Sequence, residues 1–346
     1  MKKVMVFISM AIVVTLFVPL SASAQQKAIT WVGQAVNDPG SPFMKSFEQM
    51  CADITKASNG RLVLKPNPVG TIVPFGKEWD ALRAKTLDFA NSNTMWYSER
   101  SPSAALFTYM VGGLSPMEFY LWLEAGDGVP LLQKAMKGCN AYIIPNSGIL
   151  PTPETFMYSK KQVNKVADLK GIKMRTAGDG GLVLSKLGVN TVGIPYPEIY
   201  DSMKKGVIDA FEAAPPSYDV TQGMHEVSPY IYLSGARQPM EWIPIAVRED
   251  LWQALPDDLK IIVTKISKEA ALHSYADCVK EDAAAIQVFR KFGCKVEILN
   301  PEIEAAVEKA AEEVYAEKSA KDATTAEVVK SLIAWKKQIR AQYPRL

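Results

Sequence analysis

The stretch IKMRTAGDGGLVLSKLGVNTVGIPYPEIYDSMKKGVIDAFEA, residues 172–213, decides the fold class of this chain. Short apolar runs alternate here with segments of helical period, which is typical of βαβ units. Strands are expected at 172–175, 189–194 and 207–213, with helices at 180–187 and 197–205. The second helix is closed by Gly206. The sequence therefore predicts an α/β protein.

The patterns on either side of this stretch predict two lobes joined by a hinge. A strand at 29–35 and a helix capped by Ser41 begin the mature chain in the same α/β style. Proline- and glycine-rich residues 145–153 interrupt the pattern, and Arg237-Gln238-Pro239 interrupt it again. Because two interruptions imply two crossings between lobes, we assign 25–150 and 239–300 to lobe 1 and 151–238 to lobe 2.

The last third of the chain is predicted to be helical. From Pro256 to Phe292 almost no helix breaker occurs before Gly293, so one very long helix, or two end to end, is expected. Residues 301–346 should form further helices that pack on the lobes. The last of them carries Trp335, which could lie on its own lobe or on a partner chain, and we favour its own lobe.

The N-terminus predicts export. Lys2 and Lys3 precede an apolar run at 4–20, and Ala22-Ser23-Ala24 forms a small-x-small cleavage site. Residues 1–24 are therefore predicted to be a signal peptide cleaved after Ala24. Without the two lysines, 37 of the 39 Lys and Arg residues balance 37 Asp and Glu residues. A chain with no basic surplus is not expected to bind nucleic acid.

Length and composition bound the class of protein further. The chain has 346 residues, of which 48% are hydrophobic and 22% charged, as in a soluble protein of about two domains. The spacing of the four cysteines includes no C-x-x-C motif, so they are expected to be buried thiols or to form one or two disulfides. They are Cys51, Cys139, Cys278 and Cys294. Since the chain holds only two histidines, a Cys/His zinc site is not expected.

The search for catalytic chemistry is negative, and two other residues are better candidates for a site. No nucleophile-base pair with a supporting carboxylate is suggested around His225 or His273, so the chain is not expected to be an enzyme. Arg175 ends one predicted strand and Glu212 another, at the sheet edge where α/β proteins bind ligands. The guanidinium could grip a carboxylate with two hydrogen bonds, or the two residues could simply pair with each other.

Several runs of sequence resemble one family, the solute-binding proteins of TRAP (tripartite ATP-independent periplasmic) transporters. They are NGRLVLKPNPVGTIVP at 59–74, ALRAKTLDFA at 81–90, DLKGIKMR at 168–175, EIYDSMKKGVIDAFE at 198–212 and VREDLWQALPDDLK at 247–260. The resemblance covers nearly the whole mature chain. It implies a two-lobed periplasmic receptor with a long lobe-spanning helix, which closes on a small organic acid and delivers it to TRAP membrane subunits.

The resemblance also implies a binding site. Arg175 matches the arginine that grips the ligand carboxylate. The run GTIVPFGKEWDAL at 70–82 is similar to the branch that binds 2-oxo acids and lactate, where Trp96 and Tyr97 would wall the pocket opposite Phe156. No arginine stands near Phe156, where members that take dicarboxylates carry a second one. A monocarboxylate is therefore expected.

Some members of that branch hold a metal ion beside the carboxylate. The resemblance places its ligands at Glu212, at an acidic residue where this chain has Gln238, and at an amide where it has Leu150 or Pro151. Glu212 with Gln238 alone would make a weak site for sodium or calcium, so no cofactor is expected beyond such an ion. An ABC-type receptor, a sensor-linked binding protein and a secreted α/β enzyme are the alternatives.

Overall fold

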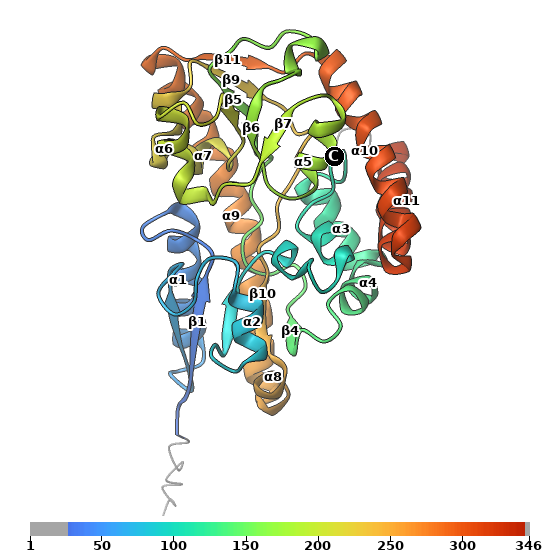
Figure 1. The fold of residues 1–346 in the computed structure, drawn as a ribbon. Helices are drawn as coiled ribbons and strands as arrows, with labels where there is room; N and C mark the ends of the chain where they lie inside the picture. Colours follow the sequence, from blue (N-terminus) through green and yellow to red (C-terminus); the bar gives the residue numbers. More distant parts are fainter. Residues whose placement is uncertain (1–26, 343–346) are drawn as a thin grey trace, which may run out of the picture.

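A computed structural model describes residues 27–342, which form two α/β lobes, each built on its own sheet (Figure 1). The predicted signal peptide lies outside the described residues. Within residues 27–342 no helix is both long and apolar enough to cross a membrane. The predicted fold class and the two-lobed architecture are confirmed.

The first lobe is built on a five-stranded sheet of order β2-β1-β3-β10-β4, in which β10 runs antiparallel to its two neighbours. Its strands are β1 (Ile29–Ala35), β2 (Leu62–Asn67), β3 (Phe89–Asn91), β4 (Ala141–Ile143) and β10 (Ile245–Arg248). Its helices are α1 (Pro42–Ala57), α2 (Glu78–Arg83), α3 (Pro116–Ala125), α4 (Gly128–Ala135) and α8 (Glu249–Ala254). Ser41 caps α1 as predicted, because its side chain accepts the N–H of Met44.

The second lobe is built on a six-stranded sheet of order β11-β9-β5-β8-β6-β7. Its strands are β5 (Thr155–Ser159), β6 (Lys173–Arg175), β7 (Asn190–Val192), β8 (Ala210–Phe211), β9 (Tyr230–Leu233) and β11 (Lys295–Ile298). Its helices are α5 (Gly178–Lys186), α6 (Ile199–Lys204) and α7 (Pro216–Asp219). Strand β6 runs parallel to both β7 and β8, so the βαβ units predicted for residues 172–213 are present.

The two crossing segments between the lobes lie side by side. Ile149 and Ile243 exchange backbone hydrogen bonds of 3.0 and 2.9 Å, and the N–H of Glu154 donates to the carbonyl of Gln238 at 3.3 Å. A paired ribbon of two short segments connects the sheets in this way. It brings residues 154 and 238, far apart in the sequence, to one place.

A third connection is the helix α9 (Asp257–Phe292), whose 36 residues give it a length of about 54 Å (Figure 1). Leu259 and Val263 pack in the core of the first lobe. Ala285 and Phe289 pack in the core of the second. The assignment of residues 239–300 to lobe 1 is wrong at β11, because α9 carries the chain across and β11 pairs with β9.

The C-terminal helices α10 (Pro301–Lys321) and α11 (Ala323–Gln342) cover one side of both lobes (Figure 1). Lys318 of α10 pairs with Asp179 of α5 at 2.6 Å, in the second lobe. The indole N–H of Trp335 in α11 donates to the carbonyl of Glu118 at 3.0 Å, in the first. Trp335 therefore lies on its own chain. All four cysteines are buried free thiols.

Candidate binding site

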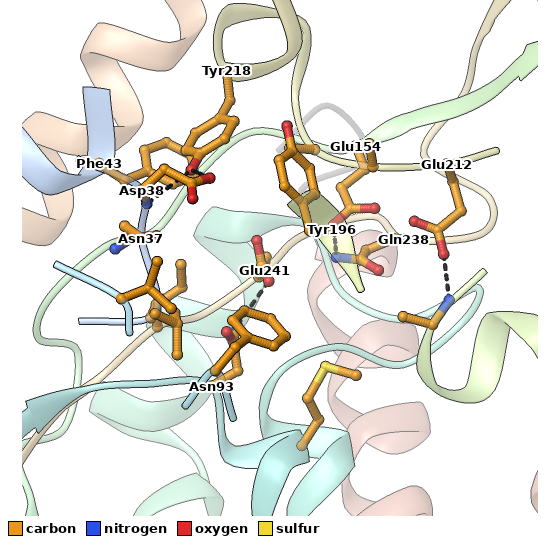
Figure 2. A pocket seen from close by; sticks show the side chains of 18 of the residues that line it. Asn37, Asp38, Phe43, Asn93, Glu154, Tyr196, Glu212, Tyr218, Gln238 and Glu241 are labelled. Atoms are coloured by element: carbon orange, nitrogen blue, oxygen red, sulfur yellow. Dashed lines mark hydrogen bonds between the residues drawn. The ribbon is translucent and has the colours of Figure 1, made fainter. Parts of the chain in front are cut away.

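A cavity of about 100 Å³ lies between the two lobes. That volume would hold roughly seven to ten water molecules, or one small organic molecule. From the first lobe it is lined mainly by Asn37, Asp38, Phe43, Asn93, Met95, Trp96, Tyr109 and Glu241. From the second it is lined mainly by Arg175 and by five residues labelled in Figure 2, which are Glu154, Tyr196, Glu212, Tyr218 and Gln238.

Arg175 reaches this cavity from the end of β6 and is held firmly by acceptors of its own lobe. Its Nε donates to the carbonyl of Ile194 at 2.9 Å, and its Nη1 donates to the carbonyl of Glu212 at 2.8 Å. Nη1 also contacts the Glu212 carboxylate at 3.1 Å. Among the described residues no acceptor engages Nη2, so this nitrogen is available to a ligand carboxylate.

Glu212 follows β8 and is almost fully buried. One carboxylate oxygen accepts the backbone N–H of Ala177 at 2.6 Å, just before α5 (Figure 2). The other accepts Nη1 of Arg175. Burial acts to raise the pKa of Glu212, but Arg237 and Arg175 outweigh burial and hold the pKa below its ordinary value. Glu212 is therefore an anion that orients Arg175.

A second buried group is centred on Arg237, whose side chain is 0% exposed. Its Nη2 lies 2.5 Å from Glu154 Oε2 and 3.6 Å from Glu212 Oε2, and its Nη1 donates to Gln238 Oε1 at 3.2 Å. The Gln238 amide donates to the other oxygen of Glu154 (Figure 2). Burial raises the pKa of Glu154, yet both its oxygens accept N–H groups, which is the geometry of an ionised carboxylate.

Glu241 adds a third carboxyl group, from the first-lobe side of the cavity. It accepts the amide N–H of Asn93 at 2.7 Å (Figure 2). Burial, helped by the charge of Glu212, raises the pKa of Glu241 to about 7, against the effects of Asn93 and Arg237. Glu241 is thus the group at this site whose charge changes near neutral pH.

Aromatic side chains form much of the remaining wall, and two tyrosines join the lobes. Trp96 meets Phe75 edge to face at 4.9 Å. The hydroxyl of Tyr218 donates to Asp38 of the first lobe at 2.9 Å (Figure 2), and that of Tyr109 donates to the carbonyl of Ala177 in the second lobe at 2.9 Å. The lobes are closed around the cavity.

The structure brings together four of the six residues proposed from the sequence: Arg175, Trp96, Glu212 and Gln238 line the cavity. Tyr97 does not, because it lies in the first-lobe core against Trp79, with ring centroids 6.1 Å apart. Phe156 does not either, since it is completely buried in β5.

Several ionisable residues of the site were not singled out from the sequence, among them Glu154, Arg237 and Glu241. Glu154 stands two residues before Phe156 in the same run, and Arg237 directly precedes Gln238. Leu150, one of the two positions where the resemblance places the family's amide, is buried in the core, and the side chain beside Gln238 is Glu154.

Comparison with known proteins identifies the family. The model of the DctP family, bacterial extracellular solute-binding proteins of family 7, matches residues 33–322. The chain belongs to this family. It is 30% identical, over 85% of its length and 80% of the relative's, to a monocarboxylate 2-oxoacid-binding periplasmic protein of Nostoc sp.. Members of the DctP family are transport receptors rather than enzymes.

Two solved structures of TRAP periplasmic solute-binding proteins are similar to this chain. The one from Pseudoalteromonas atlantica, with bound sodium and pyruvate, has a TM-score of 0.85 at 26% identity. The one from Colwellia psychrerythraea, with bound calcium and pyruvate, has a TM-score of 0.86 at 28% identity. Each comparison covers 91% of this chain and 96% of the other. These similarities place the chain among the TRAP periplasmic solute-binding proteins.

The residues of this chain do not fit a metal ion well. In the part of the chain that the structure describes, no three His, Cys, Asp or Glu side chains gather in a metal-binding arrangement. The side-chain oxygens of Glu154, Glu212 and Gln238 already accept N–H groups, and Arg237 contacts all three residues. Sodium and calcium need several oxygens with negative charge and no competing cation. The predicted pair Glu212 and Gln238 therefore does not provide a suitable site for sodium or calcium.

Proposed function

We propose that the protein captures a small monocarboxylate, a 2-oxo or 2-hydroxy acid such as pyruvate, in the cavity between its lobes. The observation that carries this proposal is the free Nη2 of Arg175. Its other polar nitrogens are fixed by Ile194 and Glu212, so the guanidinium is oriented before a ligand arrives. A carboxylate that meets Nη2 gains a charge-assisted hydrogen bond away from bulk water.

The lining of the cavity favours a ligand with one carboxylate. The volume, which would hold roughly seven to ten water molecules, admits a small organic acid. Glu154, Glu212 and Glu241 line the same cavity as Arg175, so a second carboxylate on the ligand would face repulsion. Trp96 and Phe43 offer apolar surface to the rest of the ligand. The Nostoc relative, named for monocarboxylate 2-oxoacids, and the two structures with pyruvate support the same class.

Binding is coupled to closure of the lobes about the paired ribbon at residues 149 and 243. A ligand shifts the balance of open and closed forms only by its extra contacts in the closed form. Those contacts come from Arg175 on one lobe and from Trp96 on the other. We propose that the mature receptor begins after Ala24, works in the periplasm and hands its ligand to TRAP membrane subunits.

A panel of ligands tests the proposal. Pyruvate, lactate, succinate, glucuronate and pyruvamide are added to the purified protein, and thermal unfolding and calorimetry are measured. Pyruvate or lactate at about 100 times its Kd should add about 2.7 kcal/mol of stability. Pyruvamide, which has the shape of pyruvate without the charge, serves as the matched control and should not bind. Binding of succinate or glucuronate in preference to both monocarboxylates would refute the assigned ligand class.

A further inference from the structure

The guanidinium of Arg237 is a completely buried cation placed directly behind the wall of the cavity. Its side chain is 0% exposed and packs against Gly180 of α5, where an added Cβ would lie 3.2 Å from Arg237 Cγ. Burial acts to lower the pKa of Arg237, but the carboxylates of Glu212 and Glu154 raise it above its ordinary value. Arg237 therefore carries a permanent positive charge.

Arg237 contacts three of the oxygen-bearing side chains that could otherwise bind a cation beside the ligand. Nη2 lies 2.5 Å from Glu154 and 3.6 Å from Glu212, and Nη1 binds the amide oxygen of Gln238 at 3.2 Å. These three side chains line the cavity while Arg237 itself does not. The positive charge thus neutralises the wall from behind and leaves the cavity free.

A metal ion at this wall would have to share its ligands with that charge. Two like charges about 4 Å apart repel by about 4 kcal/mol at the effective dielectric constant near a protein surface. Without Arg237, only Arg175 would offset the charges of Glu154 and Glu212 that a ligand carboxylate meets. The Arg237 guanidinium supplies a second positive charge at this wall.

We propose that Arg237 is a built-in substitute for a metal ion, so that this receptor binds its carboxylate independently of sodium and calcium. The proposal rests on the proposed function. Arg237 does not touch the ligand. It is a positioning residue that fixes Glu154 and Glu212 and offsets their charge, whereas the similar structures with pyruvate hold sodium or calcium.

Calorimetry with pyruvate in two buffers tests the inference on the unmodified protein. One buffer is free of sodium and treated with a chelator, and the other contains added calcium or sodium. The Kd should differ by less than about threefold between them, which corresponds to about 0.7 kcal/mol. If pyruvate binds only when calcium or sodium is present, the inference is wrong while the proposed function stands. If none of the small monocarboxylates binds in either buffer, the proposed function fails instead.

Substitution of Arg237 provides the second arm. Arg237→Met keeps the volume of the stem but removes the charge, so pyruvate affinity in the metal-free buffer should fall at least about tenfold. Added calcium should restore it, because the freed oxygens of Glu154, Glu212 and Gln238 can then bind the ion. Arg237→Lys, which keeps the charge, should remain independent of metal.

A control variant and a direct measurement of calcium binding complete the experiment on Arg237. Arg248→Met, which removes an arginine paired with Asp88 at 3.2 Å on the first lobe, should leave both affinities unchanged. If the Arg237→Met variant folds but does not bind pyruvate, and neither calcium nor sodium restores binding, then Arg237 does not take the place of a metal ion. Should Arg237→Met not fold, titration of the unmodified protein with calcium decides, since heat of calcium binding at this site would overturn the inference.

Discussion

Replacement of Arg175 by methionine gives the sharpest test of the binding site. The change removes the guanidinium while its apolar stem is retained, so the cavity keeps most of its shape. In the wild-type protein Nη2 would pair with the ligand carboxylate while Nε and Nη1 stay bound to Ile194 and Glu212. Removal of one partner of a buried ion pair costs about 3–5 kcal/mol. At 1.4 kcal/mol per decade, pyruvate affinity should fall about a hundredfold to a few thousandfold.

The fold should survive this substitution because Glu212 keeps other partners. One of its oxygens still accepts the N–H of Ala177 at 2.6 Å, and Arg237 remains 3.6 Å away. Calorimetry with pyruvate measures the affinity, and thermal unfolding without ligand checks the fold. Arg248→Met is the matched control and should bind normally. Wild-type affinity in a folded Arg175→Met variant would refute the anchoring role of Arg175.

Three further predictions concern pH, closure and stability. Because a bound anion favours the protonated form of Glu241, whose pKa is about 7, carboxylate affinity should fall as pH rises through 7, and Glu241→Gln should abolish this trend in calorimetry at pH 6 and 8. Tyr218→Phe removes the hydrogen bond to Asp38 that joins the lobes and should weaken binding by about 1 kcal/mol, seen as roughly fivefold faster ligand release in stopped-flow measurements. Phe289→Ala should lower the free energy of unfolding by about 3–5 kcal/mol in urea titrations, with pyruvate affinity unchanged at low temperature, because Phe289 is fully buried in the second-lobe core.

The sequence predicted those parts of the fold whose signals are local. The βαβ units of residues 172–213 and the long helix α9 follow from periodicity and breakers within the segment itself. Strand β5 (Thr155–Ser159) was not predicted, because all five of its residues are buried and it shows no alternation of period two. The placement of β11 depends on the path of α9 between the lobes, which no local pattern encodes.

The same distinction holds at the site. Arg175 and Glu212 could be proposed because each ends a predicted strand at one edge of a sheet. Arg237 and Glu154 could not, because they meet only when two crossing segments 83 residues apart pair with each other. Tyr97 was misplaced because it lies next to Trp96 in a 3-10 helix, where successive side chains point about 120° apart.

The position of β10 determines how the molecule can be assembled. This strand lies between β3 and β4 in the first sheet, although the second-lobe residues 151–238 precede it in the chain. The sheet therefore has a gap between β3 and β4 until residue 248 is available. Neither half of the molecule corresponds to a continuous stretch of polypeptide that could fold alone. Truncation between β4 and β10 would leave unsatisfied strand edges on both sides of that gap. A newly made chain can complete its first lobe only after most of its second lobe has been delivered.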